Sequence, residues 1–174
     1  MANTYKKIAS VTVGSGGAAS IDFTSIPATY TDLVVKLSTR RSDTTEGYLS
    51  LRFNANSGSN YSNRTIRGTG SAASSSNDSS TTFLDFWVID GSGYTANTFA
   101  STDVYIPNYA GSTNKSVSAE NVAENNATTS YMQITAGLWA QTAAINQITF
   151  YAAGAPSGTF VQYSTATLYG IKNS

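Results

Sequence analysis

Seven residues in the first half of the chain have side chains suited to contacts with a ligand or a partner protein. They are five arginines and two tyrosines: Arg40, Arg41, Tyr48, Arg52, Tyr61, Arg64 and Arg67. Arginine donates hydrogen bonds from a planar fork, and tyrosine joins an apolar ring to a hydroxyl, so both types favour protein interfaces and glycan recognition. The alternative is that these charges lie along strand edges, where they deter edge-to-edge pairing of sheets.

Catalytic chemistry has few candidates, because the sequence contains no cysteine and no histidine. Ser-His-Asp and Cys-His arrangements and zinc sites built from Cys and His are therefore excluded. A glycosidase needs only two carboxylates, and three pairs lie close in sequence: Asp43 and Glu46, Asp85 and Asp90, Glu120 and Glu124. Ordinary acids in turns and at strand edges explain these pairs better. We therefore expect no enzyme and no catalytic residue.

Bound metals and cofactors are also not expected. The segments 43–46 and 90–93 place oxygen ligands close together, as calcium requires, but neither has the spacing of an EF-hand. No phosphate-binding loop and no dinucleotide-binding fingerprint is present. Ordinary turn chemistry is the favoured interpretation of both segments.

The overall composition argues against nucleic-acid and membrane partners. Ten basic and ten acidic residues give a formal net charge of zero, and only 11% of residues are charged. No long-range field would attract the protein to nucleic acid or to an anionic membrane. No stretch is apolar enough for a signal peptide or a membrane span, which predicts a soluble protein made without Sec export.

Alternation of apolar and polar residues predicts an all-β protein. Pairs such as Val11 and Val13, Met132 and Ile134, and Ile148 and Phe150 recur at the period of 2 that half-buried strands require. Glycine, asparagine, aspartate and serine separate the segments. We expect one antiparallel β-sandwich, jelly-roll-like, over residues 1–174 with about ten short strands. The expected strands are 5–13, 31–40, 47–54, 60–67, 81–89, 97–107, 116–123, 129–139, 145–152 and 159–169.

A segment rich in serine and glycine, residues 68–80, has no large apolar side chain to bury. It is expected to be an exposed, flexible loop, and either a tolerated insertion or a contact region. Trp87 and Trp139 lie in apolar strands and are assigned to the interior or to a subunit interface.

Four segments resemble small virion structural proteins of tailed bacteriophages, including cyanophages and other marine phages. They are residues 23–35, 49–54, 57–62 and 166–172, and the likeness extends over most of the chain. The resemblance implies a β-sandwich displayed on the particle surface after assembly in the host cytoplasm. It also implies a homo-oligomer, with a trimer favoured, in which apolar strand faces such as residues 83–89 are buried between subunits. It carries no catalytic residues.

Two functions follow from the resemblance. The first is a head decoration or cement protein that clamps neighbouring major capsid subunits. It is favoured because strands begin and end close to the two chain ends, which leaves no room for a fibre shaft. The alternative is a tail or fibre-tip module that binds a host surface glycan through its loops. If the arginines contact the head, replacing Arg40 and Arg41 with alanine should weaken occupancy on isolated heads. In the fibre-tip alternative, the same change should instead reduce adsorption.

Overall fold

The computed structural model describes residues 4–45, 47–126, 130–152 and 158–172, with the side chain of Trp87 outside the description. Twelve strands and no helix occur in this part of the chain, so none of its segments is a helix that could span a membrane. The strands are β1 Tyr5–Thr12, β2 Ser20–Phe23, β3 Asp32–Thr39, β4 Gly47–Phe53, β5 Tyr61–Gly68, β6 Ala73–Thr81, β7 Leu84–Ile89, β8 Ala100–Ile106, β9 Lys115–Ala123, β10 Tyr131–Trp139, β11 Ile148–Ala152 and β12 Thr165–Ile171.

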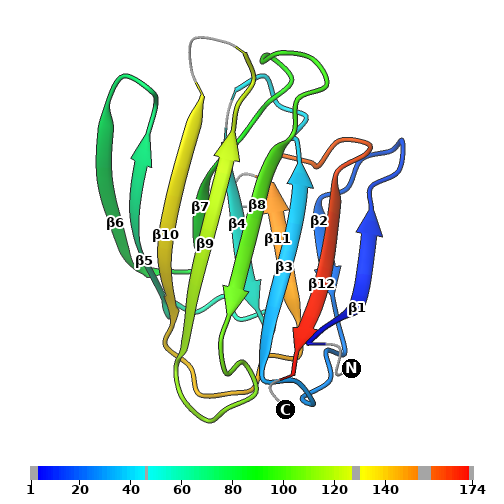
Figure 1. The fold of residues 1–174 in the computed structure, drawn as a ribbon, viewed down its shortest axis with the longest axis vertical. Helices are drawn as coiled ribbons and strands as arrows, with labels where there is room; N and C mark the ends of the chain where they lie inside the picture. The colour runs from blue at the N-terminus through cyan, green and yellow to red at the C-terminus, as the bar shows by residue number, and fades with distance from the viewer. Residues whose placement is uncertain (1–3, 46, 127–129, 153–157, 173–174) are drawn as a thin grey trace.

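The strands form two antiparallel sheets that pack face to face (Figure 1). The larger sheet has the order β1-β12-β3-β8-β9-β10-β5-β6, and the smaller has the order β2-β11-β4-β7. Strand β7 packs against β5, β9 and β10, whereas the β6 side of the larger sheet extends beyond the smaller sheet. The prediction of an all-β antiparallel sandwich is confirmed.

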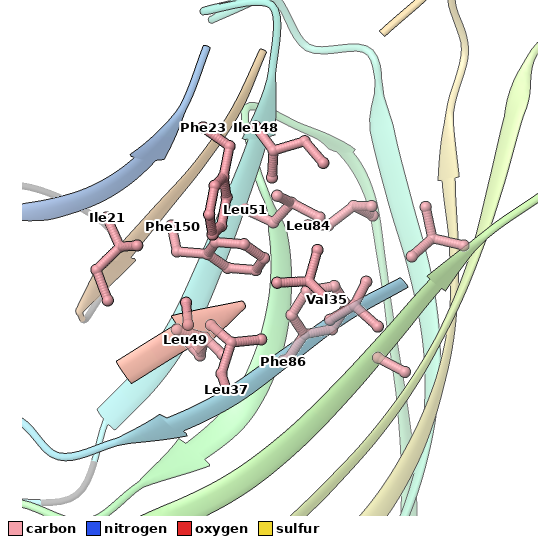
Figure 2. Close-up of a cluster of buried hydrophobic side chains, with 14 of the residues drawn as sticks. Ile21, Phe23, Val35, Leu37, Leu49, Leu51, Leu84, Phe86, Ile148 and Phe150 are labelled. Carbon is pink, nitrogen blue, oxygen red and sulfur yellow. The ribbon is translucent and has the colours of Figure 1, made fainter. Parts of the chain in front are cut away.

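Alternating apolar side chains from both sheets make the core between them. In β4, Leu49, Leu51 and Phe53 point inward, and in β11 Ile148 and Phe150 do the same. Figure 2 shows Leu49, Leu51, Ile148 and Phe150 meeting side chains of β2, β3 and β7. All of them, with Phe53, belong to one continuous cluster. Burial of this apolar surface is the main favourable term that holds the sheets together.

Two strands were not anticipated from the sequence. Strand β2 is only four residues long. Strand β6 lies in the segment expected to be a loop, and that expectation is wrong for Ala73–Thr81, which pairs with β5 along its length. A tight turn, in which the Thr69 N–H donates to the Ala72 carbonyl, brings β6 back beside β5. Almost all of its side chains are exposed, so backbone pairing and not burial defines this strand.

The last expected strand, 159–169, begins later than predicted, at Thr165. Before it, Phe160 forms isolated bridges with Ala18 and Arg41. Residues 83–89 were expected to be buried between subunits, but Leu84, Phe86, Val88 and Ile89 are buried within the chain's own core. These four side chains are therefore not available for a contact between subunits. Trp139 is also interior.

Candidate binding face

The larger sheet reverses the usual alternation over part of β5, β9 and β10. On the inner side of these strands lie five buried polar residues: Asn63, Thr65, Asn121, Gln133 and Thr135. On the outer side lie four large apolar residues with high exposed fractions: Ile66 at 68%, Met132 at 65%, Ile134 at 63% and Val122 at 44%. Met132 and Ile134 have the strand period that the sequence indicated, and the side of β10 on which they lie faces outward.

Strand register gathers the four apolar side chains into one surface, called here the apolar patch (Ile66, Val122, Met132 and Ile134). Ile134 lies directly opposite Ile66 on β5, and Met132 lies directly opposite Val122 on β9. Side chains opposite each other on one face are in contact range. The patch therefore crosses three neighbouring strands without interruption.

The surface around the apolar patch is hollowed into an open groove of about 1070 Å³, called here the apolar trough. Small residues line parts of it, including Gly68, Ala73 and Ala136. An exposed apolar surface of this kind on a protein marks a site of interaction.

Two charged residues lie at the same end of the apolar patch, one on each of the strands beside β10. Glu120 lies on β9 directly opposite Ile134, and Arg64 lies on β5 two residues before Ile66. Both line the trough and both side chains are exposed. Within the described part of the chain, neither forms an ion pair or a side-chain hydrogen bond.

A second, polar hollow of about 490 Å³ continues across the outer face and shares Glu120 and Val122 with the trough. Its other lining residues are mainly polar: Lys36, Leu37, Ser38, Ser101, Asp103, Thr165, Thr167 and Tyr169. Lys36 and Asp103 form an ion pair there. The hydrogen bond to Asp103 raises the pKa of Lys36 above its usual value.

Beneath the apolar patch, most of the buried polar side chains have hydrogen-bond partners within the sheet. The hydroxyls of Thr65 and Thr135 are 3.0 Å apart, and Asn121 Nδ2 donates to Thr102 Oγ1 at 2.6 Å. Neither side-chain polar atom of Gln133 has a partner among the described residues. The interior below the trough is therefore polar, while its outer surface is apolar.

Replacing Thr65 with valine should lower the free energy of unfolding by about 1 kcal/mol, because the Thr135 hydroxyl then loses its buried partner. Replacing both threonines with valine should bring the free energy of unfolding back towards that of the wild type, since no hydroxyl is left unpaired. Urea unfolding of the two single variants and the double variant measures this. A double variant whose loss equals the sum of the single losses would contradict the pairing.

The arginines and tyrosines singled out from the sequence do not form one cluster. Arg40 and Arg41 are buried at the end of β3, and Tyr61 is buried in the core. Arg40 Nη1 donates to the carbonyls of Thr95 and Thr98, both at 2.9 Å, and Nη2 donates to the Tyr94 carbonyl at 3.1 Å.

Arg41 forms an ion pair with Asp43. Because Arg40 and Arg41 act inside the fold, alanine in their place would reduce occupancy on heads through loss of folding. Such variants therefore cannot test a surface contact.

Two of the remaining four residues lie away from the trough. Tyr48 and Arg52 lie on β4, on the side facing away from the core. The Arg52 guanidinium stacks 3.7 Å from the Phe83 ring centroid, and its Nε donates to the Thr82 carbonyl at 3.1 Å.

Arg67 alternates with Arg64 along β5 and so points to the opposite side of that strand. There it donates to the Ser74 hydroxyl at 3.0 Å. Arg64 and Arg67 both line the trough, and Arg64 is the one of the two that lies on the outer face beside the apolar patch.

Most of the carboxylates considered for catalysis or metal binding have local roles where they are described, Glu120 being the exception. Burial raises the pKa of Asp85, which accepts a hydrogen bond from Ser50 at 2.5 Å. Asp90 accepts from Thr98 and Asn125, at 3.0 and 3.1 Å. The Asn126 N–H and the Ser130 hydroxyl lower the pKa of Glu124. Glu46 lies outside the described residues. No group of three or more acidic residues within the described ranges is close enough to hold a metal ion.

The sequence reading missed the outer apolar residues, although their signal is present. In β10 the polar residues Gln133 and Thr135 keep the same phase as the buried Trp139, so Met132 and Ile134 belong to the opposite face. Comparison with protein-family models, with curated proteins and with solved structures found no match to this chain.

Proposed function

We propose that the chain is a non-enzymatic virion structural protein of a tailed bacteriophage that acts as a capsid decoration or cement protein and stabilises the head. The observation that carries this proposal is the apolar trough, a docking surface on an otherwise hydroxyl-rich and neutral protein. Exposed apolar surface is unfavourable in water, so a stable partner is expected to cover it. The sequence resemblance supplies the virion as the setting.

Strand order supports a more specific description of the fold. Without β5, β6, β9 and β10, the strands form two four-stranded sheets, β1-β12-β3-β8 and β2-β11-β4-β7. This is the strand arrangement of a jelly roll, a fold found in viral capsid and lectin domains. In this proposal, the hairpins β5–β6 and β9–β10 are insertions that widen one sheet. The argument from fold to function is an analogy.

The apolar patch lies entirely on these two inserted hairpins, since Ile66 is on β5, Val122 on β9, and Met132 and Ile134 on β10. Function commonly resides in parts added to a shared scaffold. The proposed partners are therefore the major capsid protein or other virion structural proteins, and further copies of the chain. The homotrimer implied by the resemblance stays a prediction. Nucleic acid and membrane are not proposed as partners.

The alternative is a tail or fibre-tip module that binds a host surface glycan. The polar hollow beside the trough favours it, because hydroxyls of Ser38, Ser101 and Thr167 line a concave surface next to Tyr169. Hydroxyl and aromatic side chains together suit the polar edges and apolar faces of sugars.

Gold-labelled antibody on intact virions, counted separately over head and tail by electron microscopy, tests the proposal. We expect label over the head surface. Label confined to the tail or its fibres would contradict a decoration or cement role and favour the glycan-binding alternative. Particles lacking the protein serve as the control for non-specific label.

A further inference from the structure

We propose that a second copy of this chain covers the apolar trough, in a twofold dimer in which the same outer face of both copies is buried. The inference rests on the proposed role of the trough as a docking surface and names its occupant. It concerns the protein in solution, so it can be tested without a virion.

The first argument is the distribution of exposed aliphatic side chains. Among the described residues, the large aliphatic side chains that are exposed are Ile66, Val122, Met132, Ile134 and Leu138. All five lie on the outer face of β5, β9 and β10, while the other large exposed apolar residues are tyrosines. An apolar centre with a polar surround is the usual anatomy of a protein interface.

The second argument is charge. Arg64 on β5 and Glu120 on β9 lie at the same end of the apolar patch, on either side of β10. Neither side chain forms an ion pair or a hydrogen bond with the described residues. A twofold interface is self-complementary, so a residue on β5 of one copy can meet a residue on β9 of the other. An axis that passes through the patch between these two residues brings Arg64 of each copy to Glu120 of the other. The same axis places Ile66 against Ile134.

This complementarity favours a second copy over a different protein. One chain supplies both the apolar surface and both members of the charge pair, so no further partner is needed to satisfy the face. In the dimer, the surface of each copy outside the buried outer face stays exposed, and the two exposed surfaces are identical. Two such surfaces fit the clamping of two neighbouring capsid subunits, which the proposed function requires.

Sedimentation equilibrium of the purified chain at up to about 100 µM, far above a micromolar Kd, measures the assembly. We expect a species of twice the 18.3 kDa chain mass. The Ile134→Asp variant should sediment as a monomer, because a carboxylate would be buried in the apolar centre. Since Ile134 is exposed in the single chain, circular dichroism should show an unchanged fold.

Charge reversal tests the pairing itself. Glu120→Arg alone and Arg64→Glu alone should each raise the dimer Kd about tenfold or more, because like charges then meet across the interface. The double variant, Glu120→Arg with Arg64→Glu, should restore a Kd close to that of the wild type. Tyr163→Ser, which alters a side chain as exposed as Ile66 but away from the trough, should leave the Kd unchanged.

A monomeric wild-type chain at the highest concentration would overturn the inference. So would a trimer, which would agree instead with the homotrimer implied by the resemblance. A dimer in which the double charge variant is no better than the single variants would overturn the proposed pairing and the axis. None of these results bears on where antibody binds the virion. Sedimentation therefore tests the dimer, and antibody labelling tests the proposed function independently.

Discussion

Replacing Arg40 with alanine should lower the free energy of unfolding by about 3 kcal/mol or more. The guanidinium is buried and is surrounded by the carbonyls of Tyr94, Thr95 and Thr98. Hydrogen bonds from a charged donor contribute about 1.5–3 kcal/mol each, and buried acceptors that lose a donor incur a desolvation penalty. The variant should therefore release the segment from Tyr94 to Thr98 from the end of β3.

Urea unfolding at neutral pH measures the effect. Lys6→Ala, which removes a charge from an exposed side chain, should change the free energy of unfolding by no more than about 0.5 kcal/mol. Arg40→Lys keeps the charge but cannot match the planar fork, so it should recover only part of the loss. It also provides a milder variant if the alanine variant does not fold. An alanine variant as stable as the wild type would show that the hydrogen bonds of the buried guanidinium do not stabilise the fold.

A second large effect is expected at alkaline pH, and its source is Tyr61. This side chain is buried against Trp139, with ring centroids 6.2 Å apart, and its hydroxyl accepts a hydrogen bond from the Phe53 N–H at 3.1 Å. Burial raises the pKa of Tyr61 from 10.0 to about 12. A shift of this size corresponds to roughly 2–3 kcal/mol.

The direction of the pH effect follows from proton binding. Between pH 10 and 12 the unfolded chain loses the Tyr61 proton while the folded chain keeps it. The contribution of Tyr61 is therefore fully present below pH 10 and is lost as the pH rises through 12. Titration of tyrosinate absorbance should show one group that ionises only near pH 12 or on unfolding.

The Tyr61→Phe variant should be less stable than the wild type by about 1 kcal/mol at pH 8, because the Phe53 N–H loses its acceptor. That difference should shrink or reverse as the pH approaches 12, since the phenylalanine variant has no proton to lose. Urea unfolding of both proteins from pH 8 to 11.5 measures it. Tyr163→Phe, the same change at an exposed site, is the control. A difference that stays constant with pH would contradict the assignment.

The sequence was sufficient for most of the fold, because strands such as β9 alternate clearly between buried and exposed positions. It was insufficient for β6, whose serines and asparagine give no periodic signal. The pairing of β6 with β5 supplies its structure, and that pairing is a property of two segments together. Local preference is readily overridden in this way by tertiary context.

The candidate site was harder to predict for a different reason. The sequence places Arg40 and Arg41 near Tyr48, but the acceptors that bury Arg40 come from residues more than fifty positions later. In β10 the alternation of side chains could be recognised in the sequence. Which of the two alternating sets faces the core could not. Apolar residues are normally expected on the inner face of a strand. In β10, Gln133 and Thr135 lie on the inner face and Ile134 lies on the outer face.

The position of β12 in the larger sheet has a consequence for how the chain folds. This last strand lies between β1 and β3, where it pairs with both. Until it is synthesised, the two earlier strands have no neighbour on that side, and β1 has no partner in the sheet. Contacts between such distant segments make folding slow, and the open slot exposes strand edges to aggregation during translation. Completion of the larger sheet is thus a late event in folding.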